Sequence, residues 1–245
     1  MITLENVSKS FSGRPALSEV DLKVPRGCLY GLIGPGAAGK TLVLKAICGL
    51  ITPDSGRVVC GGNDVGRLSP AELSAYRRSI GMQFQNNALF DFMTVAENIA
   101  FPLRRLMNLS DDEVRLRVAE RLTRVQLPGF EDRSPSGLSG GQKRRIGIAR
   151  ATVTRPPIVL CDEPAAGLDP VTSLRIFELL RAEQRAANST VILVSSDVDR
   201  LLTVTDRIGM MHEGRLVFDG TTAEARESTN PLIRQFLRGA LTGPL

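Results

Sequence analysis

Short apolar runs alternate along the chain with longer segments whose apolar residues recur at helical spacing. The runs are rich in Val, Ile and Leu, which is typical of strands buried on both faces of a parallel sheet. Their alternation with helices predicts an α/β domain with a largely parallel sheet. The expected strands are residues 2–7, 29–33, 57–59, 80–84, 158–161, 190–194, 207–211 and 216–219.

Capping residues mark three helix starts. Ser69 and Ser110 are each followed three residues later by glutamate, the pattern of a capping box, and Asp169 precedes a proline. The segment from approximately 86 to 154 is almost wholly helical in pattern. We therefore expect one domain, 1–245, in which 86–154 is a helical subdomain inserted between two parts of the sheet. Its apolar stripe, expected to be ordinary core, is Val114, Val118, Leu122 and Val125.

Composition narrows the class of protein. Of the 245 residues, 42% are hydrophobic and 23% charged, which excludes an intrinsically disordered chain. No run approaches the roughly 18 consecutive apolar residues of a spanning helix. The first residues also lack the basic head and apolar run of a secretory signal. The four cysteines form no Cys-x-x-Cys pair and are expected to be reduced, buried thiols: Cys28, Cys48, Cys60 and Cys161.

Charge and aromatic content bear on the ligand. The net charge of +5 is mild and spread along the chain, which suits an anionic ligand or a membrane surface without distinguishing them. The chain has no Trp and only 4% aromatic residues, which argues against a protein that binds nucleic acid by stacking bases. We therefore expect no nucleic-acid partner.

A phosphate-binding loop follows the expected strand 29–33 and precedes an apolar helix. Its small residues allow backbone N–H groups to surround phosphates, and the helix N-terminus favours negative charge. Lys40 would reach the β and γ phosphates of a nucleotide, and the Thr41 hydroxyl would coordinate Mg²⁺. The loop fits the pattern G-x-x-x-x-G-K-[ST] and consists of Gly34, Pro35, Gly36, Ala37, Ala38, Gly39, Lys40 and Thr41.

Two carboxylates follow the apolar strand 158–161. Asp162 and Glu163 fall at the carboxyl end of a buried strand, where ligands bind in open α/β sheets. Asp162 would hold Mg²⁺, directly or through water. Glu163 would polarise the attacking water as a catalytic carboxylate.

A third motif opens a further helix and consists of Ser139, Gly140, Gly141 and Gln142. A hydroxyl and free N–H groups at such a helix start bind phosphate well. The motif resembles the signature of ATP-binding-cassette (ABC) ATPases, and other elements of that family occur in order over essentially the whole chain. The resemblance places Phe11 as the adenine-stacking aromatic, although Phe11 could instead be core. It also places Gln85 as the Q-loop glutamine of catalysis and Mg²⁺ binding, and 166–169 as the D-loop.

This resemblance implies the fold of a P-loop NTPase: a RecA-like mixed sheet core, an N-terminal antiparallel β region and an inserted helical subdomain. It implies ATP and Mg²⁺ as cofactors, and a head-to-tail dimer in which Ser139 of one copy faces the phosphate loop of the other. The other partner would be a transmembrane permease subunit, at the cytoplasmic face of the inner membrane. Four residues after the Q-loop are either local core or the docking surface for that permease: Leu89, Phe90, Phe92 and Met93.

The chain departs from the family pattern at two positions. Ser196 stands where a switch histidine belongs, so we expect near-normal ATP affinity with slow hydrolysis. The single histidine, His212, lies in an expected hairpin turn and is not expected to substitute for it. Ala37 replaces a usual glycine and is expected to narrow the phosphate loop slightly. The basic run 143–145 is expected to be a solvated helix face.

Within the family, residues 84–103 and 235–239 resemble the ATPases of maintenance-of-lipid-asymmetry (Mla) and related Mce-associated transporters. This likeness implies phospholipid as the transported substrate and a lipid-binding Mce-type subunit as a further partner. The alternatives are a transporter ATPase for another small solute and a slow-turnover nucleotide switch. A soluble ABC ATPase that acts on DNA or ribosomes fits less well, because 245 residues leave no room for a coiled-coil insertion or a second cassette.

Overall fold

The computed structural model describes residues 1–86 and 88–245. Its strands are β1 (Ile2–Phe11), β2 (Arg14–Val24), β3 (Leu29–Ile33), β4 (Ser55–Cys60), β5 (Asn63–Asp64), β6 (Ile80–Gln83), β7 (Ile158–Asp162), β8 (Thr190–Val194), β9 (Arg207–His212) and β10 (Arg215–Thr221). Within these residues an antiparallel sheet has the order β2-β1-β4-β5, and a second sheet has the order β10-β9-β3-β8-β7-β6. The second sheet is parallel except for β10. The predicted mixed sheet and N-terminal antiparallel region are therefore confirmed.

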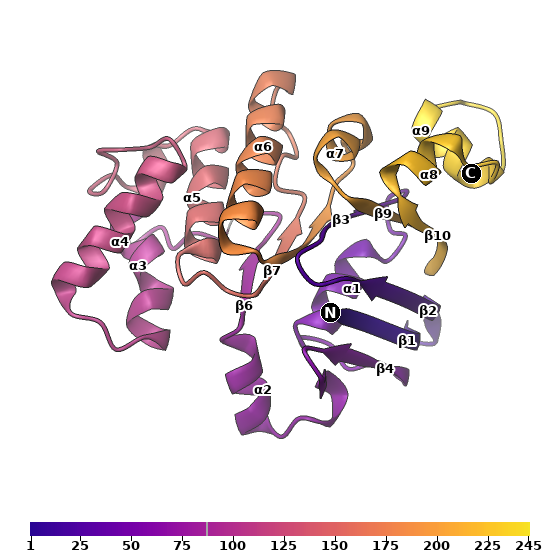
Figure 1. The fold of residues 1–245 in the computed structure, drawn as a ribbon, viewed down its shortest axis with the longest axis horizontal. Coiled ribbons are helices and arrows are strands. Elements are labelled where there is room, and N and C mark those ends of the chain that lie inside the picture. Colours follow the sequence, from indigo (N-terminus) through magenta and orange to yellow (C-terminus); the bar gives the residue numbers. More distant parts are fainter. Residues whose placement is uncertain (87) are drawn as a thin grey trace.

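Helices cover both faces of the mixed sheet. They are α1 (Lys40–Ile47), α2 (Pro70–Arg77), α3 (Val95–Leu106), α4 (Asp111–Arg124), α5 (Gly140–Thr152), α6 (Pro170–Ala187), α7 (Val198–Val204), α8 (Thr222–Glu227) and α9 (Pro231–Arg238), with short 3₁₀ turns η1 (Val65–Arg67) and η2 (Pro135–Gly137). Figure 1 shows α5, α6 and α7 in a row along one face, with α1 and the antiparallel sheet across from them. Ser69, Ser110 and Asp169 cap α2, α4 and α6, as predicted.

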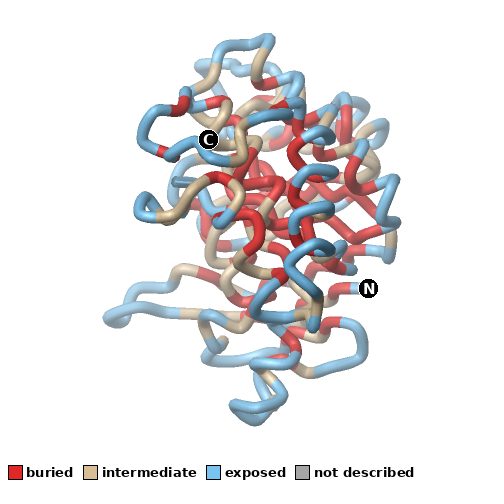
Figure 2. Tube along the Cα trace, turned by 90° about the vertical axis from the view of Figure 1, so that its left-hand side faces the viewer, coloured by how far each residue is buried: buried red, intermediate tan, exposed pale blue. Residues whose placement is uncertain are grey.

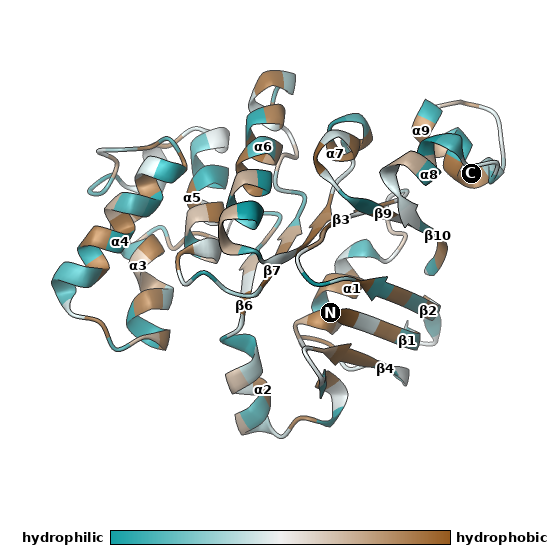
Figure 3. Ribbon diagram, viewed as in Figure 1, coloured by the Kyte–Doolittle hydropathy of each residue, from teal (hydrophilic) through white to brown (hydrophobic). Residues whose placement is uncertain are grey.

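Strand β3 shows how the sheet separates two cores. Successive side chains of a strand point to opposite faces. Tyr30 and Leu32 accordingly pack in a cluster with β1, β2, β4 and α1, whereas Leu29 and Ile33 pack in a cluster with α6 and α7. All five residues of β3 are buried, and Figure 3 shows the central strands as largely hydrophobic. Burial on both faces holds the C-terminal end of β3 in place, and the phosphate loop begins directly after that end.

The helices α3, α4 and α5 lie between β6 and β7 in the sequence and build a cluster of their own. The predicted stripe of α4, including Val118 and Leu122, is buried in that cluster, which confirms it as core. Helix α5 contributes Ile146 to this cluster and Ile148 to the cluster of α6 and α7. Figure 2 shows that buried segments gather in the middle of the molecule and exposed segments lie around them. Helix α5 is thus shared between two cores.

Asn87, within the stretch 84–103, lies outside the described residues.

Strand β2 is the long element that the hydrophobic pattern did not predict. Its buried residues Leu17, Val20 and Leu22 change phase between 17 and 20, because Glu19 has a φ of 50° and the register with β1 shifts there. Asn6, with a φ of 51°, lies at a second register shift between these strands, between Leu4 and Val7 of β1. A β-bulge of this kind breaks the period-2 alternation by which a strand is found in a sequence.

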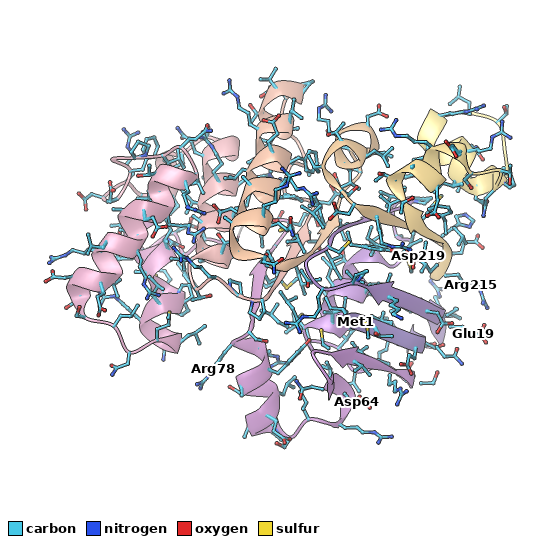
Figure 4. The ribbon with its side chains drawn as sticks, viewed as in Figure 1. Met1, Glu19, Asp64, Arg78, Arg215 and Asp219 are labelled. Carbon is cyan, nitrogen blue, oxygen red and sulfur yellow. The ribbon has the colours of Figure 1, made fainter. Side chains whose placement is uncertain are left out.

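An ion pair links the edges of the two sheets. Arg215 of β10 donates to the Glu19 carboxylate of β2 at 2.8 Å. Both residues are labelled in Figure 4. Beside it, the backbone N–H of Ser18 donates to the carbonyl of Gly214 at 2.8 Å. These contacts hold β2 of the antiparallel sheet against β10 and the β9–β10 turn of the mixed sheet.

Two expectations from composition concern cysteines and membrane spans. Within the described part of the chain, Cys28, Cys48, Cys60 and Cys161 are free and buried, as expected. No helix among residues 1–86 and 88–245 is long and apolar enough to cross a bilayer.

Candidate active site

The phosphate loop connects β3 to α1, and two of its glycines are required by their surroundings. Gly34 has a φ of 139°, and a Cβ there would lie 2.0 Å from the carbonyl oxygen of Met211. Gly39 has a φ of 98°, and a Cβ there would lie 2.8 Å from the Leu17 side chain. Both ends of the loop are therefore fixed against β9 and β2.

Ala37 adopts a conformation that normally requires glycine. Its φ is 60°, and the residue is exposed. The left-handed conformation costs an L-residue about 1–2 kcal/mol. Alanine at position 37 therefore raises the conformational energy of the loop relative to glycine. The expected slight narrowing of the loop stays a prediction.

Lys40 lies across the loop that precedes it. Its ammonium donates to the carbonyl oxygens of Gly34 at 2.7 Å and Pro35 at 2.6 Å. Burial lowers the pKa of Lys40, and the charges of Glu163 and Asp162 partly offset this effect. The cation is thus placed at the mouth of the loop, between the backbone and the two carboxylates.

Thr41 and Asp162 meet at the carboxyl ends of the strands. The Thr41 hydroxyl donates to the two carboxylate oxygens of Asp162 at 3.0 and 3.2 Å. Asp162 is 4% exposed, and this burial raises its pKa while the Thr41 hydroxyl, Lys45 and Lys40 act to lower it. Hydroxyl and carboxylate oxygens are ligands that Mg²⁺ prefers. The residues present therefore fit a magnesium ion next to the phosphate loop.

Glu163 follows β7 in a constrained conformation. Its φ is 47°, and its backbone N–H donates to the carbonyl of Val194 at 3.0 Å. The Ser196 hydroxyl donates to Oε2 of Glu163 at 3.2 Å. The residue at the switch-histidine position is therefore a direct partner of the expected catalytic carboxylate. This contact was not foreseen from the sequence, because β7 and β8 bring together residues that are far apart in the chain.

Gln85 lies at the same edge of the sheet. It comes two residues after β6, which pairs with β7 up to Gln83 and Cys161. Its side chain is exposed, and its carbonyl oxygen accepts a hydrogen bond from Arg144 at 2.7 Å. The expected Q-loop glutamine therefore follows a strand that pairs with the strand of Asp162.

Phe11 ends β1 and is 46% exposed. The ammonium of Lys9 lies 5.6 Å from the centre of its ring. The alternative that Phe11 is a core residue is therefore wrong, and its ring is accessible to a base.

The signature residues begin α5, in the helical segment. The Ser139 hydroxyl accepts from the N–H of Gln142 at 3.3 Å, and Oε1 of Gln142 accepts from the N–H of Ser139 at 2.9 Å, so the two form a capping box. Ser139 and Gly140 are exposed, while a Cβ on Gly141 would lie 3.0 Å from Thr172. The motif therefore presents its first residues to the outside of the molecule.

Two residues of the basic run 143–145, Arg144 and Arg145, are not part of a solvated face, which corrects that expectation for them. Arg144 is half-buried and donates to the carbonyl oxygens of Gln85, Glu163 and Ala166. Arg145 donates to those of Val125 at 3.3 Å and Gln126 at 3.2 Å. The sequence did not predict the contacts of either arginine, because their partners are backbone carbonyl groups, which every residue type has.

The family model described as "ABC transporter" matches residues 17–166, which include the phosphate loop, Gln85, the signature and both carboxylates. The chain belongs to the ABC transporter family. Among its relatives, the methionine import ATP-binding protein MetN of Caulobacter vibrioides is 42% identical over 98% of this chain and 73% of that protein. Protein TRIGALACTOSYLDIACYLGLYCEROL 3, chloroplastic, of Arabidopsis thaliana is 36% identical over 100% of this chain and 75% of that protein. A dimeric, post-hydrolysis structure of the ATP-binding cassette MJ0796 with ADP and Pi superposes with a TM-score of 0.84 and 32% identity, over 91% of this chain and 99% of that one.

In this ABC ATPase the expected site residues converge on one edge of the mixed sheet. The phosphate loop follows β3, Gln85 follows β6, Glu163 follows β7 and Ser196 follows β8. His212 ends β9, the parallel neighbour of β3, and pairs with Arg215 across a hairpin turn. The expected hairpin position of His212 is therefore confirmed.

Proposed function

We propose that this chain is the ATP-binding and ATP-hydrolysing subunit of a membrane transporter, with 1–245 acting as one ABC ATPase domain and 86–154 as its inserted helical subdomain. The observation that carries the proposal is the convergence of Lys40, Thr41, Asp162 and Glu163 at the carboxyl ends of the sheet. Ligands of open α/β sheets bind at that edge.

Each residue then has a task. The N–H groups of Gly34 and of residues 36–39, together with Lys40, bind the phosphates, and Phe11 stacks on the adenine. Thr41, Asp162 and Gln85 would hold Mg²⁺, which would supply positive charge beside the phosphates. Glu163 orients a water molecule and accepts its proton while the water oxygen bonds to the γ phosphorus and the bond to the β–γ bridging oxygen breaks. ADP and phosphate are the products.

Steady-state ATP hydrolysis tests this assignment. Glu163→Gln should retain ATP binding and lose hydrolysis by about 10²–10⁴-fold, because an amide cannot accept the proton. Lys40→Ala should lose ATP binding, because it removes a cation from the phosphates. Glu213→Gln is the matched control, since Glu213 is exposed in the β9–β10 hairpin. A Glu163→Gln enzyme at the parent rate would show that another group is the base.

The exposed signature supports a head-to-tail dimer, as does the dimeric state of the similar cassette. Ser139 and Gly140 lie at the start of α5, whereas the phosphate loop lies between β3 and α1. A second copy can therefore supply the signature that covers a bound ATP. Size exclusion of Glu163→Gln with ATP and Mg²⁺ should show a dimer that Ser139→Arg abolishes. A monomer at high concentration would contradict the dimer.

A groove between α3 and α4 supports a permease partner. Its volume is about 1000 Å³. Phe92 at its edge is 82% exposed, whereas Phe90 packs against Phe101 with ring centres 5.1 Å apart. The residues after the Q-loop are thus partly core and partly surface. The apolar lining consists of Phe92, Met93, Ala96, Ala100, Phe101, Val114, Val118 and Ala119.

Charges at the groove favour a helical segment of the permease as its occupant. Acidic and basic side chains flank the apolar lining, so a short amphipathic helix with both signs of charge would match it. They are Glu97, Glu131 and Asp132, and Arg104, Arg105 and Arg115. Phe92→Asp should reduce the permease that co-purifies with the chain. Leu116→Asp, a change of a 71% exposed residue outside the groove lining, should not. Equal retention in both variants would contradict this docking site.

We further propose phospholipid as the cargo, an Mce-type lipid-binding subunit as an additional partner, and a peripheral position at the cytoplasmic face of the inner membrane. The support is the likeness of 84–103 to Mla-type ATPases. The relatives include a methionine importer by name, so a small-solute transporter is the second candidate. Mass spectrometry of lipid that co-purifies with the assembled transporter tests the proposal. A periplasmic solute-binding protein encoded beside it would favour the second candidate.

A further inference from the structure

Arg144 binds two loops of the candidate active site at once. Its Nη1 donates to the carbonyl oxygens of Gln85 at 2.7 Å and Glu163 at 3.0 Å, and its Nη2 donates to that of Ala166 at 2.6 Å. Both ends of the turn that carries the catalytic carboxylate are therefore fixed by one guanidinium group. The planar fork of arginine is suited to such multiple contacts, because its N–H groups have fixed directions.

The turn at Glu163 needs such support. A non-glycine residue with a φ of 47° is strained and persists only when its surroundings hold it there. Glu163 donates its N–H to Val194, and the N–H of Ala166 donates to the Glu163 carbonyl at 3.2 Å. Arg144 supplies the external contacts on the carbonyl side of this turn.

Arg144 also belongs to the helix that begins with the signature. It follows Ser139 by five residues, which is about one and a half helical turns. A second arginine of the same helix, Arg150, donates to the carbonyl of Ala88 at 2.6 Å. Helix α5 therefore holds the start of the Q-loop segment and the Glu163 turn in one arrangement.

We propose that Arg144 is a positioning residue of the ATPase reaction, which holds the backbone of Glu163 so that its carboxylate meets the attacking water. This inference rests on the proposed function. Loss of Arg144 should leave the phosphate loop, Lys40 and Thr41 in place, because in the described part of the chain the hydrogen bonds of Arg144 go to Gln85, Glu163 and Ala166 instead. The effect should therefore fall on catalysis, with ATP binding preserved.

Arg144→Ala in the full chain should lower kcat by about 100-fold, as a misplaced catalytic group does. The dissociation constant for ATP should stay within twofold. Arg144→Lys should be intermediate, because lysine retains donors without the fork. Arg145→Ala is the matched control: it removes a half-buried arginine of the same helix that also binds two carbonyl groups. It should lower thermal stability to a similar extent and leave kcat within threefold of the parent.

Amide hydrogen exchange provides a second readout. Arg144→Ala should speed exchange in 163–169, whereas Arg145→Ala should speed it around 125–127. If the parent protein hydrolyses ATP and the Arg144→Ala and Arg145→Ala variants have the same kcat, the inference is overturned and the proposed function stands. A parent no faster than Glu163→Gln would overturn the proposed function together with this inference.

Discussion

The Ser196 hydroxyl fixes one oxygen of the Glu163 carboxylate, at 3.2 Å. A histidine at this position would be longer and could carry positive charge toward a phosphate. A preorganised donor of that kind typically contributes about 10²–10³ in rate. The serine therefore orients the proposed base without adding a cation to the transition state.

Ser196→His should raise the intrinsic ATPase rate and leave ATP affinity near the parent value. Ground-state contacts come mostly from the phosphate loop and Lys40, so affinity should change little. Steady-state hydrolysis of the two proteins with the membrane partner present measures the difference. Ser196→Ala is the control that removes the hydroxyl alone. Equal rates, or a slower histidine variant, would show that the site is adapted to its serine.

Asp162 illustrates a conflict between stability and function. Burial raises its pKa, so its ionised form destabilises the folded chain at pH 7 relative to the unfolded one. Asp162→Asn should therefore raise the free energy of unfolding, by about 0.5–2 kcal/mol for such functional residues. The gain should vanish as the pH falls below about 4, the usual range of an aspartate.

Thermal unfolding of Asp162→Asn, with and without ATP and Mg²⁺, measures both effects. The variant should melt higher than the parent without ligand and show little additional shift with ATP and Mg²⁺. A lower melting temperature than the parent, or an undiminished shift, would contradict this reading of Asp162.

At the scale of elements, a buried ion pair ties α4 to α6. Arg121 and Glu183 are 3% and 6% exposed, and they form a hydrogen-bonded pair. Arg124 also donates to Glu183 at 3.0 Å, and Arg121 to the Thr152 hydroxyl of α5 at 3.3 Å. Three helices are thus joined around one carboxylate.

Glu183→Ala should destabilise the fold by about 3–5 kcal/mol, because it leaves the Arg121 charge buried without its partner. Urea unfolding measures this loss. Glu120→Ala removes an exposed carboxylate that pairs with Arg155 at 3.0 Å, and should cost at most about 1 kcal/mol. A double change to apolar residues, Arg121→Leu with Glu183→Leu, should recover most of the stability. Similar losses in both single variants would mean that the pair is not isolated from water.

Sequence pattern predicts elements well where burial is two-sided. Strands such as β3 and β8 are continuous apolar runs, and the phosphate loop is recognisable because its backbone requires Gly34 and Gly39. The pattern fails at β2, where the bulge at Glu19 shifts the alternation. It also fails for Arg144, because its backbone partners could be any residue type. Because every residue has a backbone carbonyl group, residue types do not show which carbonyl groups a side chain will bind.

At the scale of the molecule, Asp206 joins three elements. Its carboxylate accepts from Arg181 of α6 at 2.6 and 2.9 Å, and from the N–H of Leu29 of β3 at 2.8 Å, directly before β9 begins. Burial by itself would raise the pKa of Asp206. The hydrogen bonds from Arg181 and Leu29 and the charges of Arg181 and Arg185 outweigh it and hold the pKa below its ordinary value.

The folded-state pKa of Asp206 lies below the unfolded value, so its contribution is present above about pH 4 and is lost as the pH falls through the folded pKa. Asp206→Asn should lower stability at pH 7 by about 1 kcal/mol, a modest value because the carboxylate is partly exposed. Urea unfolding at pH 7 and at pH 3 should show the difference between parent and variant shrinking in acid. A constant difference would exclude this carboxylate as a source of acid sensitivity.

The position of β3 between β8 and β9 has a consequence for synthesis on the ribosome. β3 is made early, but both of its neighbours come from the last quarter of the chain. Until Met211 has been added, Gly34 lacks the backbone against which it packs. ATP therefore cannot stabilise the nascent chain, since a ligand stabilises only the state that binds it. During most of translation the apolar strand β3 therefore has neither of its partner strands. We expect the nascent chain to be prone to aggregation, and to need a chaperone, until β8 and β9 have emerged from the ribosome.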